Sequence, residues 1–238
     1  MKLNCETAIV TGGSKGIGFG IAEALVKKNV KVAITSRSLQ AATKACDALS
    51  KIPGAEVLAI QADVRNRKEQ EDAVRQVLDK WGKLDLLVAN AGLGHFGSIE
   101  TLTHEQWDET IDTNLTGVFN SVKAALHELK KSKGYIITIS SLAGTNFFAG
   151  GAAYNASKFG LTGFTQAIML DLRKYGIKVS TIMPGSVSTY FNDQSPGQAD
   201  SWKIQIEDMG QVVIDLLEMN PRTLPSKIEI RPSAPPGA

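Results

Sequence analysis

The sequence predicts an α/β fold, a single domain in which a doubly wound parallel sheet of about seven strands carries helices on both faces. Three observations predict it. Short apolar runs alternate with longer segments that have the periodicity of amphipathic helices. A glycine-rich turn joins the first apolar run to the first helical segment, and no linker interrupts the middle of the chain. Alternation of this kind implies parallel strands joined by right-handed crossovers.

Each predicted strand is a short run dominated by apolar residues, many of them β-branched. The fifth run, Tyr135–Ile139, has the composition of a strand buried on both faces. In chain order the strands are predicted over Thr7–Thr11, Lys31–Thr35, Glu56–Gln61, Leu84–Ala89, Tyr135–Ile139, Ile177–Met183 and Lys227–Arg231.

The segments between these strands have helical periodicity. The first carries Ile17, Ile21, Leu25 and Val26 on one face. The others are predicted over Leu39–Ser50, Arg67–Lys80, a long stretch from about His104 to Lys130, a helix that contains Tyr154 and continues to about Tyr175, and Gln205–Met219. We expect one domain over residues 1–231, followed by a loose tail over residues 232–238 that is rich in Pro and small residues.

Composition and charge exclude several classes of partner. The net charge is +2 and the basic residues are scattered, so we expect no nucleic-acid partner. The first residues are too polar for a signal peptide, and no apolar run approaches the ~20 residues that cross a bilayer, so we expect a cytoplasmic protein without membrane contact. Cys5 and Cys46 have neither metal-ligand nor redox spacing; we interpret both as packing residues and expect no metal site.

The turn after the first strand has the composition of a phosphate-binding loop. Gly12, Gly16 and Gly18 give the spacing G-x-x-x-G-x-G rather than the common G-x-G-x-x-G. Glycines let the backbone turn sharply and let a pyrophosphate approach the amides at the helix start. A glycine-rich turn alone is a weak signal, but its position between the first strand and a helix favours a dinucleotide.

The end of the second strand bears on which dinucleotide binds. NAD sites usually carry an acidic residue there for the ribose 2′-hydroxyl, whereas this chain has Thr35-Ser36-Arg37 and no carboxylate. Arg37 can bind a 2′-phosphate with two hydrogen bonds, and Lys15 in the glycine turn can assist. We therefore predict NADP (NADPH) over NAD. The alternative is that Arg37 is only a solvated residue at a strand end.

Tyr154 and Lys158 lie one helical turn apart, so both side chains project from the same helix face. A nearby ammonium favours the phenolate, which predicts a lowered pKa for Tyr154. Ser141 follows the fifth strand, at the sheet edge where ligands of such folds bind. A Tyr and a Lys at this spacing also occur by chance, and the other motifs are what favour a catalytic pair.

Several motifs in this order give the chain a resemblance to the short-chain dehydrogenase/reductase family, which has a Rossmann fold. They are Thr11-Gly-Gly-Ser-Lys-Gly-Ile-Gly18, Asp63-Val64, Asn90-Ala-Gly92, Asn114, Ser141, Tyr154-x-x-x-Lys158 and Pro184-Gly185 with Thr189. The resemblance implies a catalytic set of Asn114, Ser141, Tyr154 and Lys158. It also implies a homo-oligomer, a tetramer or dimer, formed through the two long helices.

The family's roles carry over to this chain as follows. Asn114 would hold a water that relays protons through Lys158, and Lys158 would also hold the nicotinamide ribose. Asp63 and Val64 would contact the adenine. The implied cofactor-binding residues are Gly12, Ser14, Lys15, Gly16, Ile17, Gly18, Ser36, Arg37, Asp63, Val64, Asn90, Ala91, Gly92, Tyr154, Lys158, Pro184, Gly185, Val187 and Thr189.

Together these features predict an NADPH-dependent oxidoreductase that reduces a ketone or aldehyde carbonyl of a small molecule, with Tyr154 as proton donor. Two alternatives remain. A 3-oxoacyl-acyl-carrier-protein reductase is disfavoured because the chain has Ile230-Arg-Pro-Ser-Ala where such enzymes carry a Gly-Gly segment. A non-catalytic NADP-sensing or scaffold protein is disfavoured because Tyr154 and Lys158 are both retained.

The substrate pocket is expected to be apolar or aromatic, lined by the segments that follow the fourth, fifth and sixth strands. These segments are Leu93 to Phe96, Leu142 with Asn146 to Phe148, and Tyr190 to Trp202, and the lid among them is short. The residues we expect to line the pocket are His95, Phe147, Phe148 and Tyr190. His95 is the one ionisable group among them. The alternative interpretation is that His95 is a loop residue that does not contact the substrate.

Overall fold

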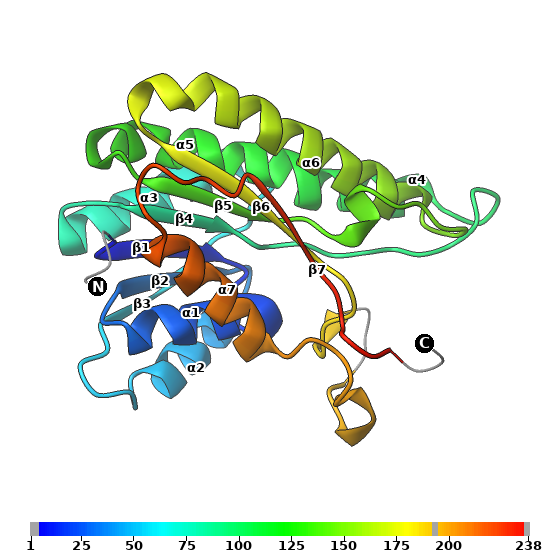
Figure 1. Ribbon diagram of the computed structural model, residues 1–238, viewed down its shortest axis with the longest axis horizontal. Coiled ribbons are helices and arrows are strands. Elements are labelled where there is room, and N and C mark those ends of the chain that lie inside the picture. Colours follow the sequence, from blue (N-terminus) through cyan, green and yellow to red (C-terminus); the bar gives the residue numbers. More distant parts are fainter. Residues whose placement is uncertain (1–4, 192–194, 236–238) are drawn as a thin grey trace.

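The computed structural model describes residues 5–191 and 195–235, and all seven of its strands form one parallel sheet (Figure 1). The strand order is β3-β2-β1-β4-β5-β6-β7. The strands are β1 (Thr7–Thr11), β2 (Lys31–Ser36), β3 (Val57–Gln61), β4 (Leu86–Ala89), β5 (Tyr135–Ile139), β6 (Lys178–Pro184) and β7 (Lys227–Ile230). The predicted doubly wound fold is confirmed.

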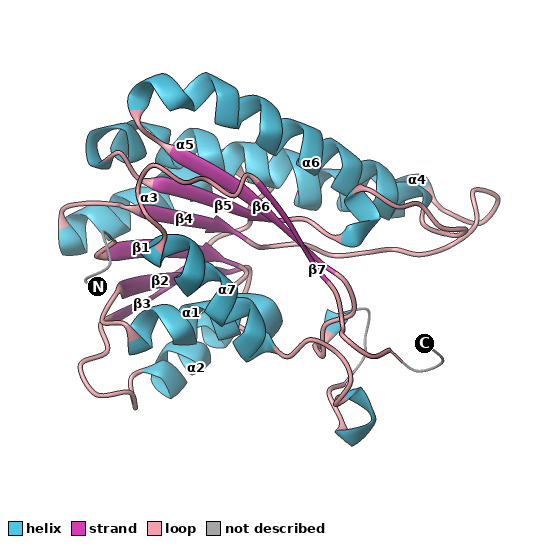
Figure 2. Ribbon diagram, viewed as in Figure 1, coloured by secondary structure: helices cyan, strands magenta, loops and turns pink. Residues whose placement is uncertain are grey.

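Helices cover both faces of the sheet (Figure 2). They are α1 (Gly16–Lys27), α2 (Leu39–Leu49), α3 (Arg67–Trp81), α4 (His104–Ile111), α5 (Gly117–Ser132), α6 (Ala152–Leu172) and α7 (Ile206–Glu218). Helices α1, α2 and α7 bury their apolar sides in one core, and α3, α5 and α6 in a second core on the opposite face.

Alternation along each strand explains how one sheet supplies both cores. Ile137 of β5 faces the core of α1 and α7, whereas its neighbour Ile136 faces the core of α3, α5 and α6. Both are fully buried. This is why the predicted strands are apolar at nearly every position.

The long helical stretch predicted from His104 to Lys130 is helical throughout, but a π turn divides it into two α-helices. Helix α4 ends at Ile111, and a π-helical turn over Asp112–Thr116 separates it from α5. Helix α4 begins with a capping box between Thr103 and Gln106. A π-helical turn contains one more residue than an α-helical turn, and such turns are frequent at functional sites. Asn114 lies inside it.

The ends of the other elements agree with the sequence to within a few residues, as expected for helix and strand boundaries. Helix α6 ends at Leu172 and continues to Tyr175 as a 3-10 turn. Met1–Asn4, residues 192–194 of the predicted lid and the last residues of the predicted tail (236–238) lie outside the described residues. Within residues 5–191 and 195–235, no helix has the length and apolar character needed to cross a bilayer.

Candidate active site

The sheet changes winding direction between β1 and β4, and the loops that follow these two strands are joined by hydrogen bonds. The Thr11 hydroxyl accepts from the backbone N–H groups of Asn90 (3.0 Å) and Ala91 (3.1 Å). The Asn90 amide donates to the carbonyl oxygens of Thr11 (2.9 Å) and Gly12 (3.2 Å). The crevice at such a switch point is where doubly wound folds bind ligands.

The glycine turn forms a cradle at the start of α1. Gly12 and Gly16 have φ of 64° and 58°, values that side chains rarely tolerate. A Cβ on Gly12 would lie 2.8 Å from the Cα of Ala91, so the two loops approach too closely for any other residue. Helix α1 begins at Gly16, and its free N–H groups and dipole favour an anion. This shape fits a pyrophosphate.

The segment after β6 reaches this cradle. A Cβ on Gly16 would lie 3.5 Å from the Thr189 side chain, which brings Thr189 beside the glycine turn. Gly185 packs close to Leu142, next to Ser141. On the other side, the hydroxyls of Ser14 and Ser36 are 3.4 Å apart. The glycine turn thus has the end of β2 on one side and the segment after β6 on the other.

The Asp63-Val64 turn is held against α5. The amide of Asn120 donates to the Val64 carbonyl (3.0 Å), and a Cβ on Gly117 would lie 2.6 Å from a Val64 methyl. Arg65 donates two hydrogen bonds to Asp63 Oδ2, from Nε at 3.0 Å and from NH2 at 2.6 Å. Burial raises the pKa of Asp63, but the hydrogen bonds and charge of Arg65 outweigh it and hold that pKa below its ordinary value.

Gly92, in the loop after β4, lies next to two of the catalytic candidates. A Cβ there would lie 3.2 Å from Asn114 Oδ1 and 3.6 Å from Lys158 Nζ. Asn114 and Lys158 come from the π turn and from α6, so the fold brings them together from distant parts of the chain.

Asn114 is fully buried and links the loop after β4 to α6. Its Oδ1 accepts from the N–H of Leu93 (2.9 Å), and its Nδ2 donates to the Leu93 carbonyl (2.8 Å) and to Ser157 Oγ (3.0 Å). Ser157 in turn donates to the Tyr154 carbonyl at 2.8 Å. Sequence reasoning missed Ser157; its signal is a small polar residue between Tyr154 and Lys158 in the same helix.

Lys158 is buried, with 5% of its surface exposed, and its Nζ donates to the Ile139 carbonyl at 3.0 Å. Burial lowers the pKa of Lys158 to about 8, because desolvation disfavours the charged form. The ammonium lies 5.6 Å from the centre of the Tyr154 ring. Tyr154 and Lys158 therefore share one helix face, as their spacing predicts.

The predicted lowering of the Tyr154 pKa is wrong for this structure. Burial raises the pKa of Tyr154, and a hydrogen bond with Ser141 works against that increase without cancelling it. Lys158 makes its hydrogen bond to Ile139 instead of the phenol. Ser141 caps a 3-10 turn over Leu142–Gly144 by accepting from the N–H of Ala143 (3.1 Å), and this fixes its hydroxyl beside Tyr154.

Aromatic rings surround Tyr154. The ring centres of Phe96 and Phe191 lie 5.2 and 5.7 Å from that of Tyr154, and Phe148 lies 6.1 Å from Phe96. These rings come from the segments after β4, β6 and β5. Phe96, Phe148 and Phe191 therefore form an aromatic cluster beside the phenol, in which 41%, 48% and 38% of their respective surfaces stay exposed.

Three of the four predicted pocket residues have other surroundings. Phe147 is 86% exposed, and the Tyr190 side chain is also largely exposed. His95 Nε2 lies 2.9 Å from the Glu109 carboxylate. Phe148 is the predicted residue that joins the aromatic group. Phe96 and Phe191 fall within the predicted segments but were not singled out, since sequence cannot tell which of several adjacent loop residues contacts Tyr154.

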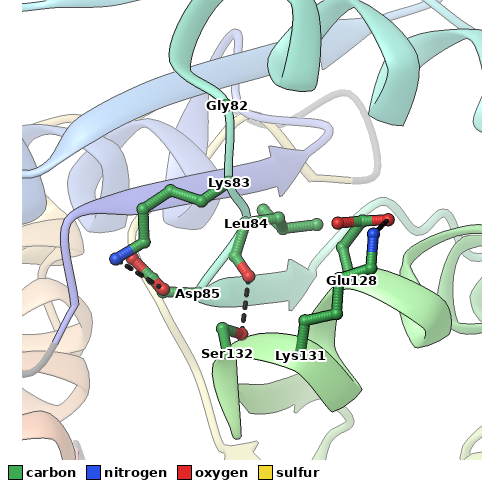
Figure 3. Close-up of a pocket in the computed structure, with 7 residues that line it drawn as sticks. All are labelled: Gly82, Lys83, Leu84, Asp85, Glu128, Lys131 and Ser132. Atoms are coloured by element: carbon green, nitrogen blue, oxygen red, sulfur yellow. Dashed lines mark hydrogen bonds and ion pairs between the residues drawn. The ribbon is translucent and has the colours of Figure 1, made fainter.

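A separate hollow of about 290 Å³ lies at the opposite, amino-terminal end of β4 (Figure 3). Its charged groups are paired with one another: Lys83 with Asp85 at 3.2 Å, and Lys131 with Glu128 at 2.8 Å. Ser132 donates to the Leu84 carbonyl at 2.7 Å. Because these polar groups already have partners, we assign no chemistry to this hollow.

Comparison with known proteins gives a family-model match described as short chain dehydrogenase over residues 6–199. The chain is 37% identical over 188 residues to a 3-oxoacyl-acyl-carrier-protein reductase of Synechocystis, covering 79% of this chain and 76% of that protein. It is 35% identical to a 15-hydroxyprostaglandin dehydrogenase (NAD+) of Macaca fascicularis, covering 88% of this chain and 80% of the relative.

A longer relative and a solved structure complete the comparison. The chain is 33% identical to part of glycine betaine reductase ATRR of Emericella nidulans; the match covers 90% of this chain but 17% of that protein. An alcohol dehydrogenase from the archaeon Thermococcus sibiricus, complexed with 5-hydroxy-NADP, superimposes with a TM-score of 0.91 at 28% identity. That match covers 96% of this chain and 97% of the other.

Proposed function

The chain belongs to the short-chain dehydrogenase/reductase family, and from this premise we propose that it reduces a ketone or aldehyde carbonyl of a small apolar or aromatic molecule to an alcohol, with NADPH as reductant. The observation that carries the proposal is the meeting of Asn114 and Lys158 at Gly92, with Tyr154 and Ser141 hydrogen-bonded beside them. These four residues are the catalytic set that we propose.

Ser141, Tyr154 and Lys158 have different roles toward a carbonyl substrate in this proposal. NADPH supplies hydride to the carbonyl carbon when it is bound. Ser141 and Tyr154 donate hydrogen bonds to the carbonyl oxygen, and Tyr154 then gives its proton to the developing alkoxide. A raised pKa suits this role, because the phenol is protonated at neutral pH before reaction. Lys158 provides positive charge that stabilises the phenolate left behind.

The glycine cradle, the Asn90–Gly92 loop and Thr189 are the residues that we propose hold the dinucleotide. The absence of a carboxylate at the end of β2 and the presence of Arg37 support NADP over NAD. The 5-hydroxy-NADP in the archaeal alcohol dehydrogenase adds support, whereas the monkey relative is named for NAD+.

The aromatic group of Phe96, Phe148 and Phe191 supports an apolar or aromatic substrate. A second candidate is reduction of a 3-oxoacyl thioester, which is favoured by the name of the Synechocystis relative. A non-catalytic NADP-sensing role is the third, and no feature of the site favours it over catalysis.

A panel of ketones, aldehydes, diketones and acetoacetyl thioesters, followed by loss of NADPH absorbance, tests the proposal. We expect the highest kcat/KM with apolar or aromatic ketones or aldehydes. A higher kcat/KM for acetoacetyl thioesters would select the second candidate. Saturable NADPH binding without turnover of any member of the panel would select the third.

We further propose that the protein forms a tetramer or dimer through α5 and α6, and that it acts in the cytoplasm. Phe119 on α5 and Phe159 and Leu170 on α6 expose large apolar side chains, which a second copy would cover. Cys5 and Cys46 are free thiols, as in proteins of reducing compartments. Residues 1–231 are proposed as the domain, with 232–238 as its tail.

A further inference from the structure

Glu109 of α4 gathers three basic side chains from three different loops. Arg37, which follows β2, places NH1 3.5 Å from Glu109 Oε1, and Arg65, which follows β3, places NH1 3.7 Å from the same oxygen. His95, in the loop after β4, lies 2.9 Å from the other carboxylate oxygen. These loops follow β2, β3 and β4 at the sheet edge where the cofactor is proposed to bind, and β1 lies between β2 and β4.

The two arginine contacts are loose. Both exceed the distance of about 2.7–2.9 Å that is typical of a charge-assisted hydrogen bond. The NH1 groups of Arg37 and Arg65 therefore both lie near one carboxylate oxygen of Glu109 without a close hydrogen bond to it. The other nitrogens of Arg65 are engaged with Asp63, which fixes the direction of its guanidinium.

Hydrogen bonding from His95 and the charges of His95, Arg37 and Arg65 hold the pKa of Glu109 below its ordinary value, so the side chain is an anion at neutral pH. The Glu109 carboxylate therefore competes with any other anion for the guanidinium groups of Arg37 and Arg65. Because His95 anchors its second oxygen, the carboxylate stays near the site when another anion takes the arginines.

We propose that Arg65 is a second ligand of the NADPH 2′-phosphate beside Arg37, and that Glu109 opposes binding of that phosphate. This inference rests on the proposed use of NADPH. A phosphate oxygen between the two NH1 groups would bind both arginines at shorter distances than the carboxylate does. Arg65 and Glu109 would then set how strongly NADPH is preferred.

Calorimetric binding of 2′-AMP and 5′-AMP tests the proposal without any turnover. We expect Arg65→Gln to weaken 2′-AMP binding about 10-fold or more while changing 5′-AMP binding by less than about 3-fold. We expect Glu109→Gln, which keeps the side-chain shape but removes the charge, to strengthen 2′-AMP binding several-fold. Arg67→Gln is the matched control, because Arg67 is 83% exposed and pairs with Glu71 of its own helix.

The outcomes separate this inference from the proposed function. Unchanged 2′-AMP binding in Arg65→Gln, with tight binding by the parent, would overturn the role of Arg65 and leave NADPH use intact. Parallel weakening of 2′-AMP and 5′-AMP would also overturn it, since Arg65 would then act through Asp63. Weaker 2′-AMP binding in Glu109→Gln would overturn the role of Glu109. A parent protein that binds 5′-AMP but not 2′-AMP would overturn NADPH preference itself.

Discussion

The proposed reaction centre and the proposed adenosine end of the cofactor site are built in opposite ways. Asn114 is 0% exposed and Lys158 5% exposed, and both are held by hydrogen bonds to backbone carbonyls. At the other end the Arg37 side chain is 63% exposed and touches Glu109 at 3.5 Å. In the proposed function, catalysis depends on buried groups whose positions are fixed by folding, and cofactor selectivity depends on charged groups that are exposed to water. Substitutions at the buried end should therefore change kcat or stability, and substitutions at the exposed end should change cofactor preference.

The largest effect is expected at the phenol. Tyr154→Phe keeps the ring packed between Phe96 and Phe191 and removes only the hydroxyl. Loss of a positioned general acid should lower kcat by about 10²–10⁴-fold. NADPH binding, followed by fluorescence, should change little. A variant that reduces carbonyls at close to the parent rate would remove Tyr154 from the mechanism.

The next largest effect is expected from replacing Lys158, and it concerns the free energy of unfolding. Its pKa falls from 10.5 to about 8 on folding, so between these pH values the unfolded chain binds more protons and stability rises with pH. Below pH 8 the full penalty of burying the charge applies. Lys158→Met should therefore unfold with a free energy higher by up to roughly 3 kcal/mol at pH 7, a gap that narrows as pH rises toward 10.5.

Urea unfolding at several pH values measures this gap, and Lys123→Met, on the exposed side of α5, is the control. The control should differ from the parent by the same small amount at every pH. A Lys158→Met variant that is less stable than the parent at pH 7 would mean that the bond to Ile139 outweighs the cost of burial.

A smaller effect is expected at the exposed end. Arg37→Asp should lower the ratio of kcat/KM for NADPH over NADH by about 10- to 100-fold, because a charge-assisted hydrogen bond contributes about 1.5–3 kcal/mol. The melting temperature should stay near that of the parent, since Arg37 is largely exposed. Arg67→Asp provides a control for charge alone. An unchanged cofactor ratio would leave Arg37 as a solvated residue without a role in selectivity.

The sequence predicted features that depend on local chemistry. The alternating strands, the glycine turn and the Tyr154–Lys158 spacing follow from periodicity and from the special backbone of glycine. The central strands were predicted because they are buried on both faces and appear as apolar runs, whereas the edge strand β7 has exposed residues at Lys227 and Glu229. The strand order fits the same logic of right-handed crossovers.

Features that depend on long-range packing were missed. The π turn around Asn114 interrupts a segment that has helical periodicity on both sides. The pKa of Tyr154 depends on burial, which spacing does not reveal. Glu109 and Arg65 meet only because α4 passes beside the ends of β2 and β3. Among the loop aromatics, composition identified the segments but not that Phe96 and Phe191 lie against the Tyr154 ring.

The smallest expected effect tests whether the hydrogen bond from Asn114 to Ser157 positions Asn114 for catalysis. Ser157→Ala removes an acceptor of Asn114 Nδ2, which keeps its bond to the Leu93 carbonyl. We expect a loss of about 1 kcal/mol in unfolding free energy and a several-fold fall in kcat with KM unchanged. Ser121→Ala is the control, because Ser121 is also buried and donates to Gln70 Oε1 (2.9 Å) on α3, away from the site. Both variants should lose similar stability. If kcat also falls equally in both, or in neither, the Ser157 contact does not position Asn114, and the buried network contributes to folding alone.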